Sequence, residues 1–122
     1  MNKILIILLC LPVLLTTCKK EENSIINSFS GNWEGTYSGS ESGIWVGSVT
    51  SDGDFINGII TSNSNDIYFA TGTVSSSGTF ELTAGTVTTG AIFSGNATGN
   101  IVNGSWQNSS EGMSGNWSGN LK

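Results

Sequence analysis

Apolar residues and glycines alternate with polar residues at period two along almost the whole chain after residue 30. Successive side chains of a β-strand point to opposite faces, so this alternation is typical of strands that bury one face and expose the other. It predicts eight strands, at residues 33–38, 44–50, 54–61, 67–74, 79–84, 89–98, 101–108 and 113–121. We therefore expect an all-β fold.

The segments between these strands are short and rich in turn-forming residues, as in Ser51-Asp52-Gly53 and Gly99-Asn100. Short turns join antiparallel neighbours, because a parallel crossover needs about a dozen residues or more. The sequence thus predicts a small antiparallel up-and-down meander of about eight strands that closes into a barrel, the last strand beside the first. A two-sheet β-sandwich is the alternative, if the meander is interrupted near residues 85–89.

Glycine recurs between two larger apolar residues on one face of the predicted strands, as in Val102-x-Gly104-x-Trp106 and Met113-x-Gly115-x-Trp117. Glycine weakens a strand unless a neighbour needs the space, so large side chains from across a narrow interior are expected there. This set is bulky, so we expect a mostly filled interior. The predicted inward residues are Trp33, Tyr37, Trp45, Val49, Ile56, Ile60, Tyr68, Val74, Phe80, Leu82, Phe93, Val102, Trp106, Met113, Trp117 and Leu121.

The same register places apolar residues on the outside of three neighbouring strands. A patch of this kind is rarely left bare on a soluble domain and marks interaction sites. It is expected to dock a partner protein or a second copy of the chain, unless segment 24–29 folds back over it or the register of the second strand is shifted. The predicted interaction patch consists of Ile44, Val46, Phe55, Ile59, Ile67 and Phe69.

Residues 4–15 form an apolar run that follows Lys3 and leads into Thr16-Thr17-Cys18. The run is shorter than the roughly 20 residues of a membrane-spanning helix, and its basic start is typical of a secretory signal. Leu15-Thr16-Thr17-Cys18 resembles the lipobox of bacterial lipoproteins, with the looser consensus of Bacteroidota. That resemblance implies cleavage before Cys18 and acylation of its sulfur. An ordinary secretory cleavage is the alternative.

The resemblance divides the chain into a signal peptide at residues 1–17, a lipid-anchored charged tether at 18–28 and a glycine-rich β-barrel domain at 29–122. Lys19-Lys20-Glu21-Glu22 resembles the export signal that places lipoproteins on the outer face of Bacteroidota outer membranes, although a solvated linker has the same composition. The implied location is the outer membrane, with the domain held through acylated Cys18 and exposed at the cell surface. The periplasmic face is the alternative.

The chain lacks the residue types that most catalytic and metal-binding sites use. There is no histidine or arginine, and the only cysteines are Cys10 and Cys18, so the usual nucleophile and base pairs cannot be assembled. Glu34 and Glu81 are predicted to point outward, where nothing would raise the pKa of a general acid for glycoside hydrolysis. We predict a protein without enzymatic activity or cofactor.

Carboxylates dominate the charge of the predicted domain. Asp52, Asp54 and Asp66 are interpreted as turn formers rather than calcium ligands, so no metal site is predicted. After residue 23, seven acidic residues stand against one base, Lys122. This balance argues against nucleic acid as a partner, because phosphates would be repelled.

Gly31-Asn32-Trp33, at the start of the first strand, resembles the Gly-x-Trp of lipocalins, avidins and bacterial metalloprotease-inhibitor barrels. The resemblance implies a calyx-shaped eight-stranded barrel. We expect a non-catalytic binding or interaction module whose partner is a protein, a glycan or a second copy. The alternatives are a structural envelope lipoprotein without a discrete ligand and a carboxylate-dependent glycan-active enzyme.

Replacement of the lipidated cysteine tests the anchoring hypothesis. The Cys18→Ser variant should incorporate no labelled fatty acid and should accumulate as unprocessed precursor, because acylation of the sulfur precedes cleavage. Metabolic labelling and gel mobility measure both effects. Normal maturation of the variant would contradict the lipoprotein interpretation.

Overall fold

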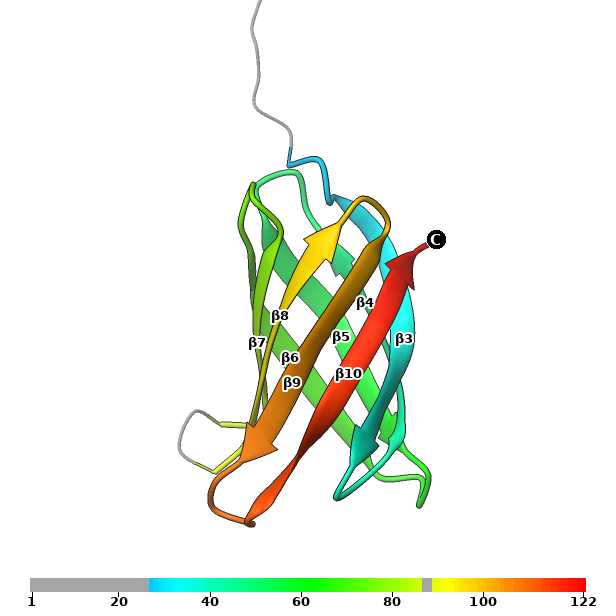
Figure 1. Ribbon diagram of the computed structural model, residues 1–122, viewed down its shortest axis with the longest axis vertical. Coiled ribbons are helices and arrows are strands. Elements are labelled where there is room, and N and C mark those ends of the chain that lie inside the picture. The colour runs from blue at the N-terminus through cyan, green and yellow to red at the C-terminus, as the bar shows by residue number, and fades with distance from the viewer. Residues whose placement is uncertain (1–26, 87–88) are drawn as a thin grey trace, which may run out of the picture.

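The protein is described by a computed structural model that covers residues 27–86 and 89–122. Eight strands follow one another along the described chain (Figure 1). Their order is β3 (Gly31–Gly39), β4 (Gly43–Val49), β5 (Asp54–Ser62), β6 (Ile67–Val74), β7 (Thr79–Ala84), β8 (Ala91–Thr98), β9 (Ile101–Asn108) and β10 (Met113–Leu121). The predicted strands agree with these bounds to within two residues.

Every strand pairs antiparallel with its neighbours in the chain, and β10 pairs with β3, from Leu121 opposite Trp33 to Gly115 opposite Gly39. The sheet is a closed barrel, so its strands present no unpaired edge. The predicted antiparallel meander and its closure are confirmed. The sandwich alternative is wrong, because β7 and β8 pair without a break from Thr79 opposite Asn96 to Ala84 opposite Ala91.

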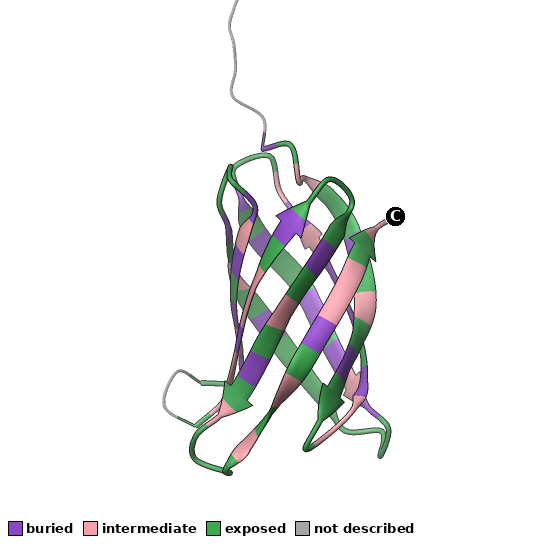
Figure 2. Ribbon diagram, viewed as in Figure 1, coloured by how far each residue is buried: buried purple, intermediate pink, exposed green. Residues whose placement is uncertain are grey.

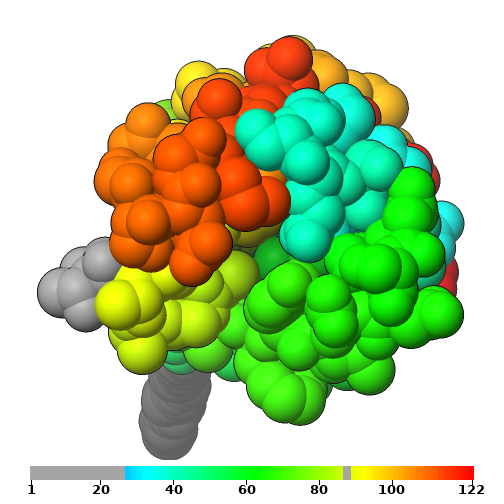
Figure 3. Space-filling model, turned by 90° about the horizontal axis from the view of Figure 1, so that it is seen from below, coloured from blue at the N-terminus to red at the C-terminus, as the bar shows by residue number. Residues whose placement is uncertain are grey.

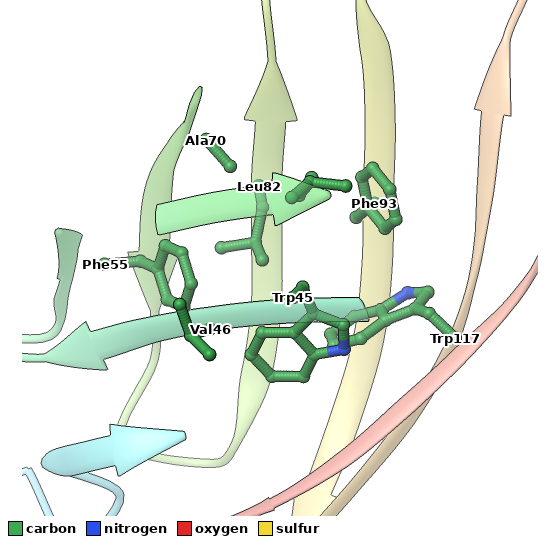
Figure 4. A pocket seen from close by; sticks show the side chains of 8 residues that line it. Trp45, Val46, Phe55, Ala70, Leu82, Phe93 and Trp117 are labelled. Atoms are coloured by element: carbon green, nitrogen blue, oxygen red, sulfur yellow. The ribbon is translucent and has the colours of Figure 1, made fainter. Parts of the chain in front are cut away.

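Large side chains fill the middle of the barrel. Buried positions interrupt exposed ones along its strands (Figure 2). Trp45 and Trp117 meet edge to face with 5.5 Å between ring centroids, and Phe80 contacts Trp117 at 5.9 Å. The void between Trp45, Phe55 and Trp117 measures about 10 Å³, near the lower limit for one water molecule (Figure 4). The expected filled interior is confirmed for this part of the barrel.

Three indole rings lie directly on backbone that only glycine leaves accessible. A Cβ atom built on Gly35 would lie 2.7 Å from Nε1 of Trp45, and one on Gly104 would lie 2.6 Å from Nε1 of Trp117. No real Cβ atom approaches a heavy atom so closely. The inward glycines of the sequence pattern are therefore the spaces that the tryptophans occupy.

Each of these indoles also donates a hydrogen bond to a strand carbonyl. Nε1 of Trp45 donates to the Ser118 oxygen at 3.0 Å, and Nε1 of Trp106 donates to the Ser38 oxygen at 2.9 Å. Nε1 of Trp117 donates to the Ser105 oxygen at 3.0 Å. Without these bonds the N–H groups would be buried with no partner. Each unpaired N–H group would cost about 1–3 kcal/mol.

The predicted register is wrong in the first half of β5. Phe55 is 2% exposed and belongs to the core, whereas Ile56 is 42% exposed. The pairing with β6 shifts between Phe55 and Gly58, and Asn57 between them has a left-handed φ of 55°. One extra residue in a bulge reverses which face each side chain takes. Phe55 therefore leaves the predicted outer patch and Ile56 leaves the predicted interior.

The start of the described chain seals one end of the barrel. Asn27 donates from Nδ2 to the Val74 oxygen at 2.8 Å, and Nε1 of Trp33 donates to the Phe29 oxygen at 2.8 Å. Phe29 packs against the core beneath it. Phe29 thus does not cover the outer patch, and residues 24–26 lie outside the described part.

Because the indoles fit against inward glycines, substitutions on the inner face of the sheet should destabilise the protein far more than substitutions on the outer face. Gly104→Val and Gly115→Val should each lower the free energy of unfolding by about 1–3 kcal/mol through overpacking. Thr36→Val, at an exposed outward position of β3, should change it little. Urea denaturation followed by tryptophan fluorescence measures the difference, and equal effects at the two kinds of position would contradict the assignment of faces.

Candidate functional site

A hollow opens at the end of the barrel opposite Asn27 and Phe29 (Figure 3). It has a volume of about 530 Å³. Its floor is made of Tyr37, Phe93 and Trp106, each at most 4% exposed. The rings of Phe93 and Trp106 are stacked 5.8 Å apart at 19°, and Tyr37 meets Trp106 edge to face at 5.8 Å. We call this hollow the mouth.

The mouth stays open because small residues end the strands on one side of it. Ala84 closes β7 and Ala91 begins β8, with Gly85 and Gly90 in the loop between them. Side chains of this size leave space above the aromatic floor. Residues 87 and 88 of the same loop lie outside the described part.

The remaining wall of the mouth combines apolar side chains with one phenol. Ile60, Met113 and Tyr68 line it. Tyr68 was predicted to point into the interior; it lines the mouth and is 38% exposed. The prediction of a mostly filled interior therefore does not hold at this end.

Two carboxylates, Glu41 and Glu111, line the mouth above the floor. The Tyr37 hydroxyl donates to Oε1 of Glu41 at 3.2 Å. Burial first, and then the negative charge of Glu41, raises the pKa of Tyr37 well above its ordinary value. This hydroxyl therefore keeps its proton at every physiological pH.

The second tyrosine of the mouth has the same electrostatic surroundings. Burial, followed by the charges of Glu41, Asp66 and Glu111, raises the pKa of Tyr68. In the described part of the chain the one basic side chain is Lys122, whose Nζ lies 3.9 Å from Oε1 of Glu34. Among the described residues, the acidic groups around the mouth thus have no basic side chain beside them.

The outer wall formed by β4, β5 and β6 carries the second candidate site. Five of the six predicted patch residues are exposed there, and Phe69 is the most exposed of them at 71%. Val46, Ile59 and Phe69 lie opposite one another in a row across the three strands. Ile56 is exposed on the same wall. The apolar wall, as we call it, consists of Ile44, Val46, Ile56, Ile59, Ile67 and Phe69.

The carboxylates considered for catalysis and calcium do not come together. Glu34 faces outward beside Lys122, and Glu81 accepts a hydrogen bond from Ser94 on the outer face at 3.2 Å. Asp54 begins β5 at the sealed end, while Asp66 follows the other end of that strand. Among residues 27–86 and 89–122, no group of three or more acidic, histidine or cysteine residues is placed to hold a metal ion.

The four tryptophans lie inside the barrel, each at most 4% exposed, which agrees with the expected core packing. Cys18 and residues 19–26 of the tether lie outside the described residues, whereas Asn27 is described and is buried at the sealed end of the barrel. In the segments that the structure covers, no helix is long and apolar enough to span a membrane.

Comparison of the chain with protein-family models, with curated proteins and with solved structures finds no match.

The mouth was not identified from the sequence. Its lining comes from three separate connections of the barrel together with strand ends. The available signal was the run of small residues at Ala84-Gly85 and Gly90-Ala91, next to the inward Tyr68. Small residues at two adjacent strand ends indicate a place where a barrel interior is not filled.

Proposed function

We propose that the chain is a lipid-anchored lipoprotein of the outer membrane whose barrel is a non-catalytic binding module, and that its ligand enters the mouth. The observation that carries this proposal is the difference between the two ends of the barrel. One end is sealed by Asn27 and Phe29, whereas the other holds a cavity of about 530 Å³ over an aromatic floor. Small-molecule sites commonly have about 300–1,000 Å³, apolar walls and few polar groups.

The position of the proposed anchor suits this arrangement. The described chain starts at the sealed end (Figure 1), and Cys18 precedes Asn27 by a stretch that reaches at most about 30 Å when extended. A lipid on Cys18 would hold the sealed end near the membrane, with the mouth turned away from it. Display at the cell surface is the proposed location, and Lys19-Lys20-Glu21-Glu22 supports it.

The composition of the mouth favours binding over catalysis. Its hydroxyl groups belong to Tyr37, Tyr68, Thr86 and Thr89, and no lysine, histidine or cysteine is among its lining residues in the described chain. A hydroxyl nucleophile needs an adjacent base to be activated. Glu34 and Glu81, the residues considered for glycoside hydrolysis, lie on the outer wall.

The apolar wall supports a second candidate function, self-association. Copies anchored at their sealed ends would stand side by side, so a twofold axis along the membrane normal would bring wall against wall. Such an isologous contact uses the same surface on both copies. Exposed, contiguous Val46, Ile59 and Phe69 are the residues that favour it.

A ligand screen by NMR tests the binding proposal. The isotope-labelled full chain, purified in a nonionic detergent, is titrated with a panel of small cations, anions, saccharides and apolar fragments. Compounds that bind should shift amide signals of residues 40–42, 63–66, 89–91 and 109–112, which surround the mouth. Shifts confined to the apolar wall, or no saturable shift with any compound, would contradict the proposal.

The self-association candidate predicts that Phe69→Glu yields a folded monomer. A charge at this position of the wall would be buried without a partner in the dimer, whereas in the monomer Phe69 is already exposed. Sedimentation velocity measures the association and circular dichroism the fold. Gln107→Glu, which adds the same charge at an exposed position of β9, is the control. A monomeric parent protein, or unfolding of Phe69→Glu, would rule this candidate out.

A further inference from the structure

We propose that the mouth selects organic cations, specifically an ammonium group carried on a small apolar body. This inference rests on the proposed function, since it presumes that the mouth holds a ligand. It is based on three properties of the cavity that coincide: carboxylates with no basic side chain beside them in the described chain, aromatic rings, and few free hydrogen-bond donors.

Among the described residues, the charged side chains at the mouth are all negative. Glu41 and Glu111 line the cavity, and Asp66 lies at the same end of the barrel. The positive charge of Lys122 lies at the other end, beside Glu34. A concave surface of low dielectric that carries one sign of charge concentrates the opposite ion and repels ions of its own sign. Anionic ligands are therefore disfavoured.

The cavity lies against aromatic rings, of which Tyr68 on the wall is 38% exposed and the three floor rings at most 4%. Tyr37, Phe93 and Trp106 pack against one another and line the cavity, and Tyr68 stands on its wall. A cation within about 6 Å of such a ring is attracted to its face, most strongly for Trp and when water is displaced. Quaternary ammonium groups are recognised in aromatic sites of this composition.

Several side-chain donors at the mouth are already bonded within the protein, and the Tyr68 hydroxyl is a further donor on its wall. The indole N–H of Trp106 is committed to the Ser38 oxygen and the Tyr37 hydroxyl proton to Glu41. Asn108 donates from Nδ2 to the Thr89 oxygen at 3.3 Å. Ionised Glu41 and Glu111 only accept hydrogen bonds. A neutral ligand with several acceptors would find few donors here, whereas an ammonium group needs none.

The walls suit an uncharged body next to the ammonium group. Ile60, Ala84 and Met113 are apolar and line the side of the cavity. An alkyl or aryl group placed there would displace water from apolar surface, which favours binding by about 25 cal/mol for each Å². A bare metal cation gains nothing from these walls.

The test compares choline with 3,3-dimethylbutan-1-ol, which has the same shape and no charge. Each is titrated into the labelled full chain in nonionic detergent at constant ionic strength, and the indole signal of Trp106 is followed by NMR. We expect a saturable shift with choline and an affinity about tenfold or more above that of the alcohol, as a desolvated cation–π contact provides.

Charge variants locate the effect at the mouth. Glu111→Gln, which leaves the bond between Tyr37 and Glu41 intact, should weaken choline binding about threefold, the size expected for a solvent-exposed charge pair. Glu34→Gln removes a carboxylate on the outer wall and should leave choline affinity unchanged. The affinity of the alcohol should be the same in all three proteins.

The outcomes separate this inference from the function on which it rests. Equal affinity for choline and the alcohol would overturn cation selection but would leave a ligand-binding mouth in place. Absence of a saturable shift with both compounds would also overturn cation selection, and the mapping of the wider compound panel would then decide whether the mouth binds anything. Equal weakening by Glu34→Gln and Glu111→Gln would show that net charge, rather than the mouth, attracts the cation.

Discussion

The indole rings that lie on glycine backbone connect strands that are not neighbours in the sheet. Trp45 projects from β4, passes over Gly35 of β3 and bonds to the Ser118 oxygen of β10. Trp106 projects from β9, passes over Gly115 of β10 and bonds to the Ser38 oxygen of β3. The two indoles thus cross the seam between β10 and β3 from opposite sides. A Cβ atom at either glycine would prevent this approach, so the closed barrel depends on these pairs.

The closed barrel in turn determines where a ligand can bind. Its middle is filled by the tryptophans and Phe55, and its sealed end by Phe29 over Trp33. Space remains only where side chains become small, at Ala84 and Ala91, so the described interior offers its large cavity at one end. The proposed anchor at Cys18 would leave that end free. The proposed anchor and the proposed binding site would therefore lie at opposite ends of the barrel.

The alternation of the sequence predicted most of the fold, because burial of one face of a sheet requires apolar residues at every second position. It failed at Phe55 and Ile56 because the bulge at Asn57 reverses the faces, and alternation alone carries no sign of an inserted residue. The Asn57-Gly58 pair was the available signal, since both residues tolerate left-handed backbone. The exposed residues of β4 and β6 were correctly placed, because their faces are set by Gly43, Trp45 and Ala70, which no bulge separates from them. The mouth was missed because alternation tells which face is inward and not how far along the axis the interior is filled.

The contacts of Trp45 across the seam between β10 and β3 can be measured directly. In the labelled protein, the indole proton of Trp45 should exchange slowly with solvent and should show nuclear Overhauser effects to α-protons of both Gly35 and Gly119. Those contacts place one side chain of β4 across β3 and β10 together, which happens only in a closed barrel. Rapid exchange of that proton, with no cross-strand contact between β3 and β10, would show an open sheet and would contradict both the closure and the mouth that depends on it.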